Sequence, residues 1–410
     1  MKTIAVVGTL DTKGEEHAFV ARLIRAQGHR ALLVDAGGLG APQVAPDIGR
    51  EEVAAAGGID LPALARQNDR GAMVAALSKA VPVLLARLAA EDRIHGIISL
   101  GGTGGTAIAT AAMRALPLGF PKVMVSTVAS GNVAPYVGVK DIVMVPSIVD
   151  VSGLNRVSRQ IFTQAAGAIC GMVAAVSTPA AASTAAAKPL IVASMFGNTT
   201  KAVDRAREQL EAAGYEVLVF HATGTGGRTM ESLIETGMVA GVLDITTTEW
   251  ADELVGGVLT AGPTRLEAAA RHGVPAIVAP GCLDMVNFGP PESVPAKFTG
   301  RKFYSHNPQV TLMRTTPAEC AELGRIIAEK VNLSIGPVTL LLPLRAISVI
   351  SEAGGPFHDT EADAALFTSL KHTLRPDIPV QEFDCTVNDP KFAEACVAAL
   401  LKNISMARHP

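Results

Sequence analysis

The chain contains 410 residues, which is more than one hydrophobic core usually accommodates and suits two or three domains. With 35 basic and 38 acidic residues its net charge is −3, without the basic excess of nucleic-acid-binding proteins. Hydrophobic residues make up 49%, but with one Trp and three Tyr the composition is typical of helices packed closely on a sheet. Five scattered cysteines without a CxxC pair disfavour a disulfide framework or a structural zinc site.

Two stretches bear on where the protein resides. MKTIAVVG at the N-terminus leads directly into an expected strand and lacks a signal-peptide pattern. The uncharged stretch 161–187 is strongly apolar over Ile161–Val176 alone, which is shorter than the roughly 20 residues of a membrane span. We therefore expect a soluble cytoplasmic protein in which Ile161–Val176 is a helix, either buried in its own domain or packed against another subunit.

Apolar, β-rich runs alternate with amphipathic helical stretches, which is the pattern of a parallel sheet covered on both faces. In the first half we expect strands at Thr3–Val7, Arg30–Asp35, Gly96–Leu100, Val123–Ser126 and Ile142–Val145. Helices are expected at Glu15–Gln27, Gly71–Ala90, Thr106–Ala115 and Asn155–Val176.

The second half restarts this layout. Residues 4–38 and 190–224 each consist of a strand, a polar turn, a helix, a glycine cap and a second strand. Shared ancestry and convergence on a common β-α-β form explain this equally well. We predict an α/β fold of two Rossmann-like doubly wound domains with mainly parallel sheets, residues 1–180 and 190–410, joined by the linker 181–189 and facing each other across a cleft.

The loop SLGGTGGT (99–106) follows an expected strand, where parallel sheets bind ligands. Glycines let backbone N–H groups converge on an anion, and the following helix adds its free N–H groups and partial positive charge. Its sequence is neither a P-loop nor the dinucleotide motif, and a tight turn is the alternative. We predict phosphate binding by Gly101, Gly102, Thr103, Gly104, Gly105 and Thr106, with hydroxyl donors from the two threonines.

The loop after the first strand, GTLDTKGEE, contains three further candidates: Thr9, Asp11 and Lys13. Lys13 can reach phosphate oxygens as a point charge, and Asp11 can hold a metal or a ribose hydroxyl. A solvated loop in which Asp11 or Thr12 caps the helix explains the same residues. Asp35, at the end of the second strand, is a candidate ribose ligand.

The second half also has polar loops at expected strand ends. Gly224–Gly227 resembles an anion nest with Arg228 beside it. Thr246–Glu249 is a cluster of hydroxyl groups and one acid at the start of an expected helix, and it is either part of a ligand site or only the cap of that helix. An acidic cluster near one strand end can bind Mg²⁺ or be a solvated helix start: Asp244, Glu249, Asp252 and Glu253. The candidate ligand-binding residues of this half are Asn198, His221, Gly224, Gly226, Thr247, Glu249, Cys282 and Asp284.

Nucleophilic catalysis would require a Ser or Cys beside a base. Cys282 lies two residues from Asp284, and His306 and His358 are candidate bases downstream. A lone Cys in an apolar chain is more often a small core residue, and Asp359 or Thr360 is expected to cap the helix that follows His358. The catalytic residues are therefore left unassigned.

Several motifs together resemble the UPF0261 family from Thr3 to about Ile404: GTLDTKGEE, SLGGTGGT, TTTE with ADELVGGVL, LDMVNFG and GGPFHD. This bacterial and fungal family is related to the N-terminal ATP-binding domain of the tomato mosaic virus resistance protein Tm-1. The resemblance implies two Rossmann-like subdomains, ATP bound between them, and a homodimer or larger homo-oligomer. It does not imply a particular reaction.

Three functional hypotheses follow. The first is an ATP-binding protein, with Mg²⁺ as the candidate metal and the phosphates on Gly101–Thr106 near Lys13, with or without ATP turnover. The second is a metabolic enzyme for a small carboxylate or sugar acid that uses His221 or Asp284, with ATP secondary. The third is a regulatory or interaction module with ATP as a conformational ligand. Neither nucleic acid nor a membrane is an expected partner.

Overall fold

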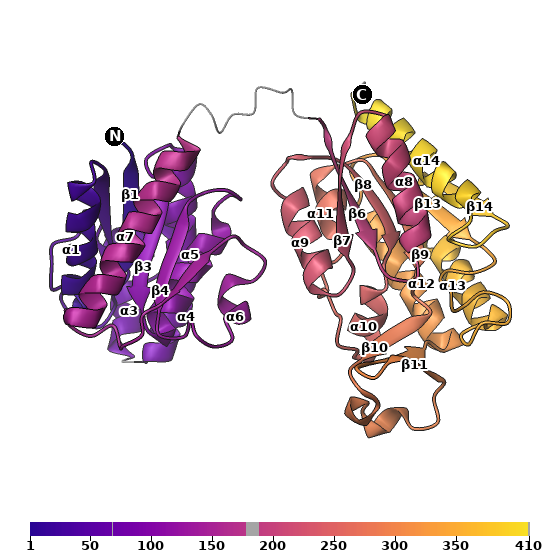
Figure 1. Ribbon diagram of the computed structural model, residues 1–410, viewed down its shortest axis with the longest axis horizontal. Coiled ribbons are helices and arrows are strands. Elements are labelled where there is room, and N and C mark those ends of the chain that lie inside the picture. The colour runs from indigo at the N-terminus through magenta and orange to yellow at the C-terminus, as the bar shows by residue number, and fades with distance from the viewer. Residues whose placement is uncertain (68, 178–187, 409–410) are drawn as a thin grey trace. The chain divides into compact units, whose positions relative to one another are not determined.

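Each half of the chain builds its own parallel sheet (Figure 1). The structure is a computed structural model that describes residues 1–67, 69–177 and 188–408. The chain divides into two compact units, residues 1–185 and 186–410, which we call the first and second domains. The predicted linker 181–189 lies, apart from Lys188 and Pro189, outside the described residues.

The first domain contains a five-stranded sheet in the order β2-β1-β3-β4-β5, in which every neighbouring pair is parallel. Of the five strands, β1, β3 and β4 are buried, mostly apolar runs because helices cover both faces of the sheet, whereas the edge strand β5 is partly exposed. Their bounds are β1 Thr3–Gly8, β2 Arg30–Asp35, β3 Gly96–Gly101, β4 Lys122–Ser126 and β5 Val143–Pro146. The five predicted strands are confirmed, and β1 lies at the interior of the sheet between β2 and β3.

Helices enclose this sheet from two sides. One face carries α1 (Leu10–Ala26) and α7 (Arg156–Val176), whose buried side chains share a core with the sheet. The other carries α2 (Arg50–Ala56), α3 (Leu61–Arg66), α4 (Arg70–Ala90) and α5 (Thr103–Ala115), while α6 (Ala134–Val137) connects β4 to β5. The apolar side chains of α7 therefore pack inside its own domain, one of the two alternatives predicted for it.

One helix of the described residues, α4, is long and apolar enough by length and composition to cross a membrane. One side of this helix, with Met73, Leu77 and Leu84, is buried in the core of the first domain, whereas Val83 is exposed. Core helices of soluble proteins pass the same test of length and composition.

Two predicted helix boundaries in the first domain were wrong. Helix α1 begins at Leu10 rather than Glu15, and α5 begins at Thr103 rather than Thr106. Glycine has a low helix propensity, but the first turn of a helix needs few internal hydrogen bonds and tolerates it. Within the early turn of α1, Lys13 has the non-helical angles φ −136° and ψ 29°, so the helix is kinked there.

The second domain contains a six-stranded parallel sheet in the order β14-β13-β9-β8-β6-β7. Its strands are β6 Leu190–Met195, β7 Glu216–His221, β8 Val239–Thr246, β9 Ala276–Gly281, β13 Val338–Pro343 and β14 Val380–Phe383. A small antiparallel sheet, β10-β12-β11, is inserted after β9: β10 Met285–Phe288, β11 Phe303–Asn307 and β12 Val310–Arg314. We call this insert, residues 285–314, the antiparallel extension.

Helices again cover both faces of the larger sheet. One face carries α8 (Thr200–Ala212) and α14 (Pro390–Arg408). The other carries α9 (Thr225–Ile234), α10 (Glu249–Val255), α11 (Glu267–His272), α12 (Pro317–Asn332) and α13 (Thr360–Thr373). Asp359 caps α13 by accepting the Ala362 N–H at 3.0 Å, as predicted. The α/β class with two doubly wound parallel sheets is confirmed.

Both domains share one strand order. Numbered within its own domain, the first strand of each sheet lies between the second and the third. The chain therefore leaves β1 into α1 on one face and leaves β3 into α5 on the other. Neighbouring loops diverge at such a switch point and leave a crevice at the carboxyl ends of the strands. The corresponding point in the second domain lies between β6 and β8.

Candidate functional site

A cavity of about 280 Å³ lies at the switch point of the first domain. It is lined by the loop after β1, the segment after β2, the N-terminal half of α4 and the first turn of α5. Most of its sequence-predicted neighbours do line it: Thr9, Asp11, Lys13, Gly102, Gly104 and Gly105.

The first turn of α5 supplies hydrogen-bond donors to this cavity. Gly102 occupies the cap position, and the N–H group of Thr106 bonds to its carbonyl at 2.9 Å. Within the described chain, the N–H groups of Thr103, Gly104 and Gly105 have no acceptor. Gly101 permits the tight turn, because a Cβ there would lie 3.1 Å from the Cα of Gly105. The N-terminus of this 13-residue helix is thus suited to bind an anion.

Thr106 does not contribute the hydroxyl donor that we predicted. Its side chain is fully buried, and its Oγ1 lies 2.6 Å from the Oγ of Ser126 at the end of β4. The helix begins three residues earlier than expected, which places Thr106 at the base of the first turn, against the sheet. Thr103, at the helix start, is exposed.

Lys13 and Asp11 both line the cavity, in the early turn of α1. The Lys13 ammonium donates a hydrogen bond to the carbonyl of Val151. Asp11 Oδ2 accepts the N–H groups of Leu39 at 3.0 Å and Gly40 at 3.2 Å, while its Oδ1 is buried and has no partner in the described chain. Asp11 therefore joins α1 to the segment after β2, rather than capping the helix.

Thr9 and Asp35 help to hold the same loops. Thr9 precedes α1 without capping it, and its hydroxyl lies 3.0 Å from that of Thr12. Asp35 is 1% exposed, and its Oδ1 accepts the N–H groups of Leu10 at 3.1 Å and Gly37 at 2.8 Å. Because its carboxylate is committed to backbone donors and does not line the cavity, the predicted ribose contact of Asp35 was wrong.

Several lining residues were missed by the sequence analysis. Arg70 begins α4, and an apolar wall is formed by Met73, Val74, Leu77 and Ile108. Asp150 comes from the loop after β5. Apolar helix residues resemble ordinary core residues in a sequence, and no local motif marks those that border a cavity.

The glycine-rich loop of the second domain has different surroundings. Glu249 Oε1 accepts the N–H groups of Gly224 at 2.7 Å and Gly227 at 3.0 Å. A Cβ at Gly227 would lie 2.2 Å from Glu249 Oε2, and one at Gly226 would lie 1.8 Å from the carbonyl oxygen of His221. The predicted anion nest is therefore occupied by the carboxylate of the chain itself.

A buried arginine, which the sequence analysis also missed, holds this carboxylate. Arg265 is 1% exposed and bonds to Glu249 through Nε at 2.7 Å. Its two terminal nitrogens bond to Asp244 at 2.6 and 2.7 Å, and Glu231 lies 3.1 Å away. Burial opposes its charge, but the three carboxylates outweigh that effect and raise the pKa of Arg265 above its ordinary value. These groups form a closed ionic cluster.

The four acidic residues, for which Mg²⁺ binding and a solvated helix start were the alternatives, each contact other groups of the chain. Asp244 and Glu249 both bind Arg265, whereas Asp252 accepts the Asn287 side-chain and backbone N–H groups at 2.7 and 2.9 Å. Glu253 instead accepts the Thr260 hydroxyl. Among the residues that the structure describes, no group of three or more His, Cys, Asp or Glu side chains could hold a metal ion.

Three other second-domain candidates make structural contacts. His221 is exposed and stacks on Phe196 with ring centroids 5.3 Å apart. The Asn198 amide lies 3.7 Å from the sulfur of Met285, and the Thr247 hydroxyl donates to the carbonyl of Ala279 at 3.2 Å.

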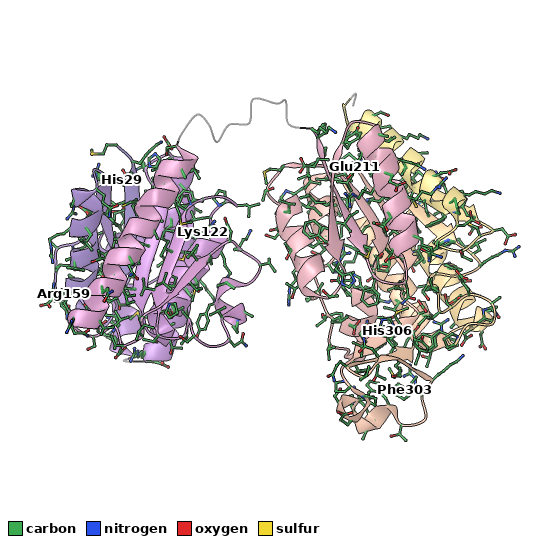
Figure 2. All side chains as sticks on the ribbon, in the orientation of Figure 1. His29, Lys122, Arg159, Glu211, Phe303 and His306 are labelled. Carbon is green, nitrogen blue, oxygen red and sulfur yellow. The ribbon has the colours of Figure 1, made fainter. Side chains whose placement is uncertain are left out.

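Cys282 is a core residue. It is fully buried in a small apolar cluster, with a left-handed φ of 61°, and burial raises the pKa of its thiol well above the ordinary value. Neither candidate base hydrogen-bonds to it: His306 lies on exposed β11 near Phe303 (Figure 2), and His358 Nδ1 lies 3.2 Å from the Ser351 carbonyl. The thiol is therefore poorly suited to be a nucleophile.

Asp284, two residues away, is also fully buried. Its Oδ2 accepts the Ser348 hydroxyl at 2.7 Å, while Oδ1 has no partner in the described chain. Burial raises the pKa of Asp284 to about 6. The carboxylate is therefore enclosed within the second domain.

Both domains match models of one uncharacterised protein family, UPF0261: its N-terminal domain over residues 2–178 and its C-terminal domain over residues 188–404. The chain belongs to the UPF0261 family. A UPF0261 protein of Clostridium tetani is 50% identical over 401 residues, covering 98% of both chains. One of Rhizobium meliloti is 51% identical over 401 residues, covering 97% of this chain and 98% of its own.

A plant relative is more distant. The tomato ToMV resistance protein Tm-1(GCR237) is 41% identical over 343 residues, which is 83% of this UPF0261 chain and 46% of the tomato protein. Among solved structures, a UDP-N-acetylglucosamine 2-epimerase from Rickettsia bellii covers 68% of this chain and 78% of its own at 12% identity, with a TM-score of 0.23. A score this low carries no argument about function.

Proposed function

We propose that the first domain of this UPF0261 protein binds ATP in the cavity at the switch point, with the phosphates at the N-terminus of α5. The observation that carries the proposal is the set of unpaired N–H groups of Thr103, Gly104 and Gly105 in the first turn of α5, of which Gly104 and Gly105 line the cavity. Such groups attract phosphate through hydrogen bonds and the helix dipole.

The remaining lining suits the other parts of a nucleotide. Lys13 and Arg70 supply positive charge for phosphate oxygens, and Met73, Val74 and Leu77 supply an apolar surface for a base. Mixed linings of this kind, with a few placed polar groups on an apolar wall, are typical of small-molecule sites.

Mg²⁺ would enter with the nucleotide. Two carboxylates line the cavity, those of Asp11 and Asp150, and the Oδ1 of Asp11 is buried without a partner in the described chain. Mg²⁺ commonly binds nucleotide phosphates together with one or two carboxylates, and it would neutralise phosphate charge here.

The second hypothesis, a small anionic substrate in the second domain, has less support. The glycine loop there already binds Glu249, and Asp284 would repel an anion. The third hypothesis, a regulatory module, uses the same ATP site and differs from the first in predicting no turnover.

A thermal-shift titration with ATP, ADP and AMP, with and without Mg²⁺, tests the site. A ligand at a hundredfold excess over its Kd stabilises the folded state by about 2.7 kcal/mol. We expect the largest shift with ATP and a smaller one with AMP, because the phosphates carry the binding. A phosphate-release assay on the same samples separates an ATPase from a regulatory module.

Gly104→Val provides the matched variant. Its Cβ would already lie 3.3 Å from Val74 on the cavity wall, so a valine reduces the space for ligand. Gly167→Val in α7 is the control, because a Cβ there meets nothing within 4 Å. Equal ATP shifts in the two variants would contradict the site, and no shift in the wild type would contradict ATP binding.

A further inference from the structure

His17 lies in α1 next to the cavity but is not part of its lining. Its side chain is completely buried. The imidazole Nδ1 lies 2.6 Å from the carbonyl oxygen of Lys13, and Nε2 lies 3.4 Å from the backbone nitrogen of Leu100. One ring thus connects the early turn of α1 to the end of β3, just before the glycine-rich loop.

These two contacts define the tautomer of the ring. A carbonyl can only accept, so Nδ1 carries the hydrogen and donates it to Lys13. A backbone N–H can only donate, so Nε2 is unprotonated and accepts from Leu100. His17 is therefore neutral in this arrangement, and a second proton on Nε2 would remove the acceptor from Leu100.

The surroundings of the ring favour the neutral form. Burial lowers the pKa of His17, although the carbonyls of Lys13 and Val7 and the carboxylate of Glu16 oppose this effect. Glu16 is itself engaged, since it accepts the N–H group of Gly153 at 2.5 Å. The Lys13 ammonium, the other charged group near the ring, donates to Val151.

The end of β1 leaves space for this ring. A Cβ at Gly8 would lie 2.0 Å from His17 Nε2, so any larger residue would displace the imidazole. Gly8 is the last residue of β1 and Leu100 belongs to β3, the two strands that flank the switch point. The ring therefore lies where the two strands that carry the cavity loops end.

We propose that neutral His17 is a positioning residue of the nucleotide site, holding the backbone of Lys13 and the end of β3 in the relative position that the phosphate seat requires. This inference rests on the proposed ATP site. The non-helical backbone of Lys13 supports it, because the carbonyl bonded to the ring belongs to this kinked residue. His17 acts through other residues and need not touch the nucleotide.

Two variants and one control test the proposal. His17→Gln removes the ring, and Gly8→Ala displaces it from the strand side. The control is His95→Gln: His95 Nδ1 accepts the N–H of Thr3 at 3.2 Å, so it performs a similar task at the opposite ends of the strands. A purely structural role would give all three variants similar behaviour.

The measurements are ATP affinity by calorimetry at pH 8 and pH 6, and amide hydrogen exchange of residues 99–106 without nucleotide. At pH 8 we expect His17→Gln and Gly8→Ala to bind ATP about 3- to 10-fold more weakly, the equivalent of about one lost hydrogen bond. His95→Gln should bind like the wild type. Exchange in 99–106 should accelerate in the first two variants alone.

The pH comparison isolates the neutral ring. The ratio between the affinities of wild type and His17→Gln should be the same at pH 6 as at pH 8, because burial lowers the pKa of His17 and the ring stays neutral at both pH values. A ratio that shrinks at pH 6 would show that the ring is protonated there and would contradict a neutral positioning residue. Protonation of ATP itself affects every protein equally and cancels in this ratio. The ratio between wild type and His95→Gln should remain constant.

The outcomes test the role of His17 separately from the proposed ATP binding. Unchanged affinity and exchange in His17→Gln, or equal losses in all three variants, would overturn the role of His17. Absence of ATP binding by the wild type would overturn the proposed function, and hydrogen exchange would still decide whether His17 orders the loop. If His17→Gln fails to fold, Gly8→Ala carries the test.

Discussion

The two glycine-rich loops of this protein are similar in composition and opposite in their surroundings. In the first domain, the N–H groups at the start of α5 border a cavity and have no acceptor within the described chain. In the second domain, Gly224 and Gly227 donate to the carboxylate of Glu249. Both helix N-termini favour an anion, but one of them receives it from its own chain.

This difference shows what a glycine-rich loop predicts by itself. The loop indicates that negative charge will approach the backbone, and the rest of the fold determines where that charge comes from. Glu249 reaches the loop from the start of α10, which follows the next strand along the chain, β8, and Arg265 holds it there. Neither residue lies in the loop motif, so the distinction depends on tertiary structure.

Removing the arginine of the closed cluster should have the largest effect. Arg265→Met leaves Asp244 and Glu249 buried without their partner, and breaking a buried ion pair in this way costs about 3 to 5 kcal/mol. Denaturant unfolding, monitored by the single Trp250 of the second domain, measures this loss. Arg271→Met, which removes a surface pair with Glu267, is the control and should change stability by under about 1 kcal/mol. Similar losses in both would show that the cluster is not important for stability.

Removing the carboxylate of Glu249 should leave the second glycine-rich loop with free N–H groups, as in the first loop. Glu249→Ala leaves the N–H groups of Gly224 and Gly227 unpaired and should destabilise the domain by about 2 to 4 kcal/mol. Added formate should restore part of this loss by occupying the vacated position, seen as a rise in Tm with formate concentration. Glu253→Ala controls for general salt effects. A formate response no larger than that of the control would contradict the filled-nest interpretation.

The cations beside the two loops should differ in importance. Lys13→Met is expected to weaken ATP binding about tenfold, since a charged hydrogen-bond donor to phosphate contributes about 1.5 to 3 kcal/mol. Arg228→Met, beside the loop already occupied by Glu249, should leave ATP affinity unchanged. Calorimetric titration of both variants makes the comparison. Equal losses would indicate a nucleotide site that involves both domains.

A buried acid beside the closed cluster should make the stability of the second domain depend on pH. Burial raises the pKa of Asp252 to about 7, although Asn287 and Leu259 donate to its carboxylate. The folded state therefore binds a proton more readily than the unfolded state, and stability should fall as the pH rises from about 4 to 7 and then level off. Asp252→Asn should remove this part of the slope. Denaturant unfolding at several pH values measures this slope. If the free energy of unfolding of Asp252→Asn depends on pH as it does in the wild type, the dependence comes from other groups.

Much of the fold could be predicted because both sheets are buried on both faces. The strands are therefore continuous apolar runs, as in β1 and β3, and polar turns separate them from helices. The strand order could not be predicted, because it depends on which face each helix covers. That order decides which loops meet at the switch point, and so it decides where the cavity forms.

The candidate site was predicted in part. Gly102, Gly104 and Lys13 line the cavity, because loops after strands can be located from the pattern alone. Thr106 was assigned wrongly because its direction depends on where α5 begins, and three residues rotate a helix by almost one turn. Asp35 was assigned wrongly because nothing in the sequence shows that backbone N–H groups would occupy its carboxylate.

The interior position of β1 has a consequence for the order in which the protein is made. Strand β1, which pairs with both β2 and β3, leaves the ribosome before either of these neighbours has been synthesised. It must wait until residue 101 has emerged before both of its edges are paired. During translation at least one edge of β1 therefore stays unpaired while residues 9–95 are made, and deleting residues 3–8 would remove an interior strand of the sheet instead of an edge strand.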